Sequence, residues 1–340
     1  MFGWFKRKIA ATRPPTLTES QAVQPARNRR DAGQVRPELL SQFLEGGATD
    51  YYTGNERWIA ALGGNPAKAI NRLVSEGLLC EASPATKLRL RFKVSELKPK
   101  LKERGLKVSG KKDALIERLL EHDPEGMIQI TRGVSACECT ERGREMATAY
   151  LDERRAKRAE AFAAMTDALA RKEYREAAMA VARYEAGQVF GRITPEELPK
   201  YKASREVRTL KSIYGRPPKI LKSVPDERLG VLRIAAAEMV LWGTNYPSET
   251  IPEGFETGNH MDPASAARMF IFFAGFQEDI RQLKQCNVRT VEVLGGGEHS
   301  CAACNKIAGR KYPINEVPEI PHADCTMDCG CRCCVVMGEI

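Results

Sequence analysis

The chain has 340 residues, a formal net charge of +9, and 43% hydrophobic and 29% charged residues. This length exceeds what one hydrophobic core normally serves, so two or three domains are expected. No apolar run reaches the roughly 18 residues of a membrane-spanning helix, and the start of the chain lacks the apolar core of a secretory signal. We therefore expect a cytoplasmic protein, and its basic balance favours polyanionic partners.

Residues 1–45 hold scattered Pro, Gln, Arg and Ser with little periodicity, which predicts a disordered basic arm. Arg27, Arg29 and Arg30 supply part of its charge. At the very start, residues 2–8 read FGWFKRK, in which aromatic side chains precede three cations. Such a run also suits a weak contact with a membrane surface.

Residues 46–87 predict a pair of helices. One covers residues 56–62, and the other begins at Asn65-Pro66 and ends at Gly77. Further on, alternation over residues 127–131 predicts a strand, and Thr140 begins a long helix. Together with residues 126–150, the helix pair would form a small winged-helix-like unit, and a small mixed core without nucleic-acid contacts fits the pattern equally well.

Residues 94–120, VSELKPKLKERGLKVSGKKDALIERLL, carry two apolar rows separated by a short polar loop. The pattern predicts a helix that Ser95 caps and Gly105 ends, and a second helix after Gly110. Residues 87–118 contain twelve Lys or Arg against four Asp or Glu, which is nearly the whole net charge of the chain. Close phosphates would relieve the mutual repulsion of these cations. The lysines concerned are Lys98, Lys102, Lys107, Lys111 and Lys112.

The same segment resembles the SAP domain. The resemblance rests on Val94-Ser95-x-Leu97, Leu101, Gly105-Leu106, Ser109-Gly110-Lys111-Lys112 and Leu115-Ile116-x-Arg118-Leu119, within residues 88–125. It implies a helix–extended loop–helix module that binds DNA, or RNA in some members, and Pro99 departs from the family pattern. It also implies that the nucleic acid is faced by Lys107, Ser109, Gly110, Lys111, Lys112 and Arg118. The alternative is a module used only for packing or for protein contacts.

Residues 141–285 predict a helical scaffold. Ala, Glu, Arg and Lys dominate its first part, where apolar residues recur at helical spacing, and a proline-rich break follows near residues 214–227. Two further helical stretches come after this break, and the second starts at Pro263. We expect the charged faces of these helices to be solvated and the region to serve as a scaffold.

The end of the chain is rich in cysteine, with seven of the eleven cysteines in the last forty residues. Without an export signal, such a cluster indicates metal binding before disulfides. Two thiol pairs about twenty residues apart are typical of a closed tetrahedral zinc site. Residues 286–340 therefore predict a small zinc-stabilised α+β segment, with disulfides or unliganded thiols as the alternative. The expected Zn²⁺ ligands are Cys301, Cys304, Cys325 and either Cys331 or Cys333.

This end also resembles the C-terminal motif of phage head-morphogenesis, or minor capsid, proteins. The elements that carry the resemblance are the strand-like NVRTVEVLG, Cys301-x2-Cys304, the step IAGRKYP, then PEIPH and Cys331-Arg332-Cys333. The spacer after His322 is longer here and holds the additional Cys325 and Cys329. The resemblance implies a virion-associated or prophage-derived role.

Three functions follow from these features. The first is a non-enzymatic DNA-binding protein that uses the SAP module for largely sequence-nonspecific phosphate contacts, with a structural zinc site at its end. The second is a phage-type head-assembly protein, for which the C-terminal segment would meet a protein partner. The third is a nucleic-acid-processing enzyme that the SAP module targets, although no P-loop or Gly-x-Ser-x-Gly motif occurs.

Overall fold

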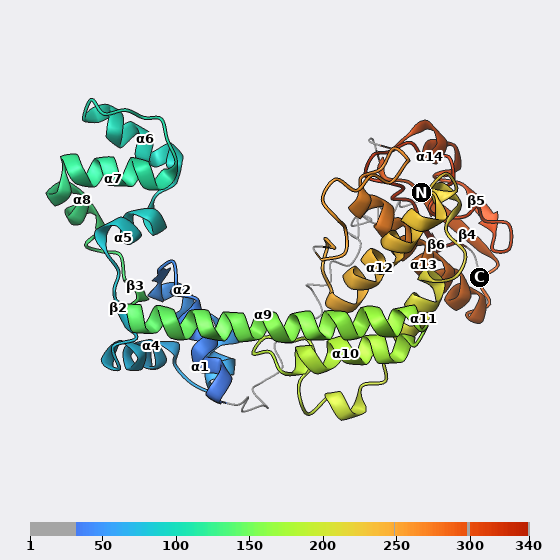
Figure 1. Ribbon diagram of the computed structural model, residues 1–340. Helices are drawn as coiled ribbons and strands as arrows, with labels where there is room; N and C mark the ends of the chain where they lie inside the picture. The colour runs from blue at the N-terminus through green and yellow to red at the C-terminus, as the bar shows by residue number, and fades with distance from the viewer. Residues whose placement is uncertain (1–31, 248, 298–299, 339–340) are drawn as a thin grey trace, which may run out of the picture. The chain divides into compact units, whose positions relative to one another are not determined.

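The computed structural model describes residues 32–247, 249–297 and 300–338, and these are mainly helical, as the sequence predicts (Figure 1). They divide into two compact units, one with residues up to 155 and residues 188–190, the other with residues 156–187 and 191 onwards. Helix α9 (Glu141–Ala170) runs from the first unit into the second. In the described ranges, no helix combines the length and the apolar character needed to cross a membrane.

The first unit begins with helix α1, whose side chains build a core. Val35, Leu39 and Phe43 are 3% exposed or less, and they pack with Trp58 and Leu73. The expectation of disorder through residue 45 is therefore wrong for residues 32–45, because their sparse apolar side chains gather on one face and are buried. The rest of the predicted arm, residues 1–31, lies outside the described residues. The helices of this core are α1 (Ala32–Ser41), α2 (Thr49–Thr53), α3 (Glu56–Leu62) and α4 (Pro66–Ser75).

A three-stranded antiparallel sheet completes this core, in the order β1 (Gly47–Ala48), β3 (Ala136–Cys139), β2 (Leu79–Glu81). The predicted helix pair is present, and the Asn65 side chain accepts a hydrogen bond of 2.9 Å from the amide of Ala67. The strand predicted at residues 127–131 is wrong. Those residues form helix α8 (Pro124–Thr131), because Met127 and Thr131 share one buried helical face and Asp123 caps the helix start. The strand of this region is β3.

The predicted basic module forms a separate small core within the first unit. Helices α6 (Val94–Glu103) and α7 (Lys112–His122) are joined by an irregular loop and flanked by α5 (Pro84–Arg91) and α8 (Figure 1). Helix α6 starts at Val94, so the predicted cap at Ser95 is wrong, and Glu96 accepts a hydrogen bond from the Lys93 amide instead. The core consists of Leu88, Leu97, Leu101, Leu115, Ile116, Leu119 and Met127.

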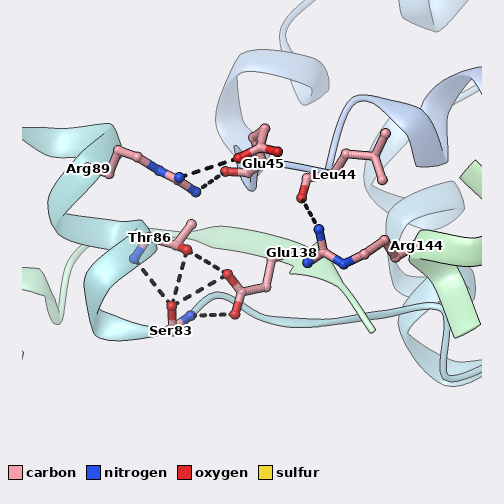
Figure 2. Close-up of polar contacts among 7 residues, drawn as sticks. All are labelled: Leu44, Glu45, Ser83, Thr86, Arg89, Glu138 and Arg144. Atoms are coloured by element: carbon pink, nitrogen blue, oxygen red, sulfur yellow. Dashed lines mark hydrogen bonds and ion pairs between the residues drawn. The ribbon is translucent and has the colours of Figure 1, made fainter. Parts of the chain in front are cut away.

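Polar contacts fix the start of α5 to the sheet (Figure 2). The Thr86 hydroxyl donates to the Glu138 carboxylate over 2.6 Å, and the Ser83 amide donates to the same carboxylate over 3.1 Å. Arg89 donates to the backbone carbonyl of Glu45 and pairs with its carboxylate over 3.4 Å. Contacts with Glu138 of β3 hold the start of α5, and contacts with Glu45, just before β1, hold its end. Helix α5 thereby connects the sheet to the basic module.

The second unit packs helices around the buried faces of α12 (Asp226–Trp242) and α13 (Pro263–Gln285). Its core includes Leu232, Ala236, Met269 and Phe270, each fully buried or nearly so. The long helical region of the prediction corresponds to α9 and α10, which part at Lys172, a residue with a positive φ of 60°. The further helices are α10 (Tyr174–Ala186), η1 (Leu198–Lys200), α11 (Ser204–Ile213), η2 (Lys219–Leu221), α12 (Asp226–Trp242) and α13 (Pro263–Gln285).

The cysteine-rich end forms a second antiparallel sheet, in the order β5 (Lys311–Pro313), β4 (Thr290–Leu294), β6 (Cys334–Met337). Helix α14 (Ala302–Ile307) lies between β4 and β5 in the chain. Val293, Cys304, Ile320 and Cys325 belong to the same buried cluster as the helices α12 and α13. The segment is therefore α+β, as expected, and it shares a core with the helical scaffold.

Candidate nucleic-acid interface and metal centre

The two halves of the cysteine cluster meet beside helix α14. Cys301 is the N-cap of this helix, and its sulfur accepts a 3.5 Å hydrogen bond from the Cys304 amide. Cys304 follows in the first turn and is buried. The chain returns to this point with Cys325 and Cys331, so thiols about 25 residues apart in sequence lie in contact. Because Cys301 caps α14 and Cys304 lies in its first turn, the sulfurs of both residues lie close together at the start of this helix.

Two of the sulfur separations match the edge length of a tetrahedral metal site. The Cys301 and Cys325 sulfurs are 3.8 Å apart, and the Cys304 and Cys331 sulfurs are also 3.8 Å apart. A zinc–sulfur bond of about 2.3 Å corresponds to a tetrahedron with edges of about 3.8 Å. Each of the two separations matches such an edge, whereas the Cys331 sulfur lies outside the group of mutually close sulfurs that Cys301, Cys304 and Cys325 form. The donor set, all thiols, is the one that zinc prefers in closed sites, so the cluster could hold a metal ion.

A fifth thiol, that of Cys333, accompanies these four. Cys301, Cys304 and Cys325 form one group of mutually close sulfurs, and Cys304, Cys331 and Cys333 form a second. Cys304 belongs to both groups, which makes it the centre of the cluster. The sequence leaves the fourth ligand open between Cys331 and Cys333, and both side chains lie within reach of Cys304.

Protonation in the cluster is uneven. A hydrogen bond from the Cys333 thiol lowers the pKa of Cys331, whereas burial raises the pKa of Cys304 and raises that of Cys325 to about 11. Burial also opposes ionisation of Cys301, but hydrogen bonds from the Cys304 and Thr326 amides outweigh it and lower its pKa to about 7. Some sulfurs therefore favour the thiolate at neutral pH. A divalent cation at this point would favour the thiolate at every ligand.

The last turn of the cluster depends on Gly330. Its φ is +77°, and a Cβ atom there would come within 2.4 Å of the Met269 side chain on α13. Glycine meets both demands, and the following Cys331 is buried in the same cluster as Met269. Other candidate ligands of the sequence lie outside the two thiol groups: His322, whose Nδ1 accepts from the Asp324 amide, Cys329, and the exposed Cys334.

Two glycines and a side chain of α7 fix the conformation of the loop between α6 and α7. Gly105 ends α6 with a φ of +67°, and Gly110 adopts a φ of +130° just before α7 begins. The Arg118 guanidinium, half-buried on α7, donates to the carbonyl of Lys107 and, over 3.4 Å, to that of Ser109. Arg118 therefore shapes the loop from the protein side, and the exposed Ser109 and Gly110 lie on its surface.

The predicted lysines fall into two kinds. Lys98, Lys102, Lys107 and Lys111 are exposed, and within the described ranges none of them forms an ion pair. Lys112 is half-buried, and its ammonium donates a 2.6 Å hydrogen bond to the Arg89 carbonyl at the end of α5. Four cations are thus free to meet an anion, while the fifth joins two helices of the module.

The start of α7 adds unsatisfied donors to this surface. Lys111 is its N-cap, and among the residues that the structure describes no side chain caps the first turn. The amides at the start of a helix point outward and carry the positive end of the helix dipole. Free amides and exposed lysines around Gly110 together make a surface that suits a phosphate group.

Comparison with known proteins identifies this module. A family model, the SAP domain, matches residues 91–124. These residues form a SAP domain. The match agrees with the resemblance seen in the sequence, and its bounds take in α6, the loop, α7 and Pro124 at the start of α8. Searches among curated proteins and among solved structures returned no match.

A SAP domain suggests nucleic-acid binding, which agrees with the exposed lysines and the uncapped start of α7. The SAP domain is supported on one side by α5 and on the other by α8, whose contributions the sequence did not indicate. Leu88 of α5 is fully buried in its core. The start of α8 could have been found in the sequence from Asp123-Pro124, because a capping residue followed by proline is typical of a helix start. The resemblance to head-morphogenesis proteins stays a prediction.

Proposed function

We propose that the chain is a DNA-binding protein whose SAP domain holds the duplex mainly through phosphates and carries out no chemistry on the strand. The observation that carries this proposal is the group of four exposed lysines without ion pairs, Lys98, Lys102, Lys107 and Lys111, in the SAP domain. Cations that repel one another in the free protein gain from contact with a polyanion, which also releases counterions.

The geometry favours backbone contacts over base recognition. Phosphate oxygens accept hydrogen bonds from amides at a helix start and from lysine ammonium groups, and such contacts carry no sequence information. The lysines are also flexible point charges without the fixed fork that reads guanine. Arg118 has that fork, but its guanidinium is occupied by the carbonyls of Lys107 and Ser109. We therefore expect weak discrimination between DNA sequences.

The cysteine cluster has a structural role in this proposal. Zinc held by Cys301, Cys304, Cys325 and Cys331 would join α14 to the loop before β6 and contribute folding energy there. With four thiolate ligands the coordination is closed, so no position is open for a substrate or a reactive water. The surface of this segment would then serve contact with a protein partner.

Binding to three duplexes tests the proposal. Fluorescence anisotropy of an AT-rich DNA, a GC-rich DNA and a double-stranded RNA of equal length would be followed with the full chain. We expect the two DNA dissociation constants to agree within about threefold, since phosphates dominate the contact. Tighter binding to the RNA would replace DNA by RNA as the partner. Plasmid nicking in the presence of Mg²⁺ or Mn²⁺ would contradict the non-enzymatic role.

Head assembly is the second candidate. The feature that favours it is the order strand β4, Cys301-x2-Cys304, then the KYP step, which here is strand β5. A protein of this kind would oligomerise or travel with particles, so sedimentation velocity of the full chain tests it. A concentration-independent monomer would count against this role.

A further inference from the structure

A groove lies between α7 of the SAP domain and the flanking helix α5, with a volume of about 570 Å³. Its floor is apolar and includes Ala85, Ile116 and Leu120. Thr86 and Arg89 of α5 form one wall, and both are fixed by the contacts that tie α5 to the sheet (Figure 2). The α5 wall of the groove is therefore a built feature of the first unit.

The other wall of the groove is a row of carboxylates. Asp113, Glu117 and Glu121 stand four residues apart on α7, all three exposed. Like charges at this spacing repel, and within the described ranges none of the three forms an ion pair. Arg89, the cation among the residues that line the groove, contacts the carbonyl and carboxylate of Glu45, and the Lys112 ammonium donates to the Arg89 carbonyl. An unbalanced acidic row beside an apolar floor suits a ligand that is both cationic and apolar.

This row differs from the phosphate-facing surface of the same helix. The row lies on the side of α7 that lines the groove with α5, whereas Lys98 and Lys102 belong to α6 and Lys107 belongs to the loop. DNA on the lysine side would therefore leave the acidic groove uncovered, and the carboxylates themselves repel phosphates. The groove needs a different partner, and a peptide segment with aromatic and basic side chains has the required chemistry.

We infer that residues 2–8 of the chain, FGWFKRK, occupy this groove. Phe2, Trp4 and Phe5 supply apolar side chains for the floor, and Lys6, Arg7 and Lys8 supply three cations for the three carboxylates. Aromatic side chains bury a large area each and dominate the energetics of such contacts. The charge of the segment and that of the groove wall match in number and are opposite in sign.

The chain is long enough for this contact. Residues 9–31 lie between the segment and α1, and 23 residues span at most about 80 Å when extended. From the start of α1 to Glu45, which contacts Arg89 at the groove, the path is at most about 30 Å. The docking is therefore feasible within one chain, where a tether raises the effective concentration of the segment.

Photocrosslinking in the full chain tests this inference. A benzophenone side chain would replace Phe5, and the products of irradiation would be mapped by mass spectrometry. We expect crosslinks within one chain to residues 84–91 and 112–121. The Glu117→Lys variant should lower their yield at least about fivefold, because it turns attraction into repulsion at the middle of the row. Glu160→Lys, at an exposed glutamate of α9, should leave the yield unchanged.

A charge-exchange experiment distinguishes loss of the contact from a loss of crosslinks caused by misfolding. Lys6→Glu with Arg7→Glu should abolish the crosslinks, and adding Glu117→Lys with Glu121→Lys should restore them. Failure of this rescue, or crosslinks to other parts of the chain, would overturn the inference. A mixture of isotopically heavy and light protein shows whether the segment reaches another copy, and crosslinks only between copies would overturn it too. So would an absence of crosslinks combined with binding of the full chain to anionic lipid vesicles.

Discussion

Arg104 and Asp123 form an ion pair of 2.6 Å that joins the end of α6 to the start of α8. The same carboxylate accepts a 3.0 Å hydrogen bond from the Gly126 amide, so it also caps α8. The Asp123 side chain thereby links the SAP domain to α8, the helix that follows it. The contacts with Arg104 and with the Gly126 amide lower the pKa of Asp123.

The first prediction concerns this pair. Asp123→Asn should speed amide hydrogen exchange in α8 and at the end of α6, because the charge that Arg104 contacts is lost. Since the folded-state pKa is below the unfolded-state value of about 4, the stabilisation is complete above that value and disappears as pH falls through the folded-state pKa. The variant should thus differ most from the wild type near neutral pH. Asp152→Asn, in an exposed pair on α9, is the control.

Lys111 and Lys112 should respond differently to alanine. Lys112→Ala removes the hydrogen bond to the Arg89 carbonyl, so exchange in α5 should accelerate by an amount equivalent to about 1 kcal/mol. Lys111→Ala should leave exchange unchanged and weaken DNA binding, since its ammonium is exposed. Equal exchange in the two variants would show that Lys112 does not join the helices.

The fourth zinc ligand can be decided by a pair of variants. Cys331→Ser should lower the zinc content measured by native mass spectrometry, because the 3.8 Å edge with Cys304 is lost. Cys333→Ser should retain one zinc per chain, since it leaves the 3.8 Å edge between Cys304 and Cys331 intact. Cys329→Ser serves as a control outside both thiol groups. The opposite result for the first two variants would make Cys333 the ligand.

Zinc affinity should fall at low pH. Burial raises the pKa of Cys304 and Cys325, so both must release a proton when they bind the metal. Two released protons correspond to about a hundredfold weaker binding for each unit by which the pH falls, and protonation of Cys301, whose pKa is about 7, steepens the loss below that pH. Competition with a chromophoric chelator at pH 6, 7 and 8 measures this slope. A flat profile would show that the thiols are ionised before zinc arrives.

Local patterns carried much of the fold prediction. Asn65-Pro66 and Thr140 mark real helix starts, because capping depends on a few adjacent residues. The resemblance to the SAP domain likewise rests on glycines and apolar residues within one short segment of the chain. Residues 127–131 failed because MIQIT fits both a strand and a helix, and only burial of Met127 beside Leu88 decides between them.

Long-range contacts account for what the sequence could not supply. The use of Lys112 depends on a carbonyl 23 residues away, and Arg118 turns toward the loop only once α7 has packed. Cys325 and Cys331 meet the first thiol pair across more than twenty residues of chain. The acidic row of α7 is visible in the sequence, but its groove requires α5, whose place is set by Glu138 of a distant strand.

The most direct test of the central claim is the salt dependence of DNA binding. Anisotropy with a labelled duplex at several salt concentrations would compare the wild type with the double variant Lys107→Ala, Lys111→Ala, and with Lys211→Ala, Lys284→Ala as the control. Phosphate contact by both lysines predicts that the slope of log K against log salt becomes shallower by about 1.8 in the first variant and stays unchanged in the control. Binding that is insensitive to salt, or that both variants retain in full, would contradict a phosphate-binding SAP domain.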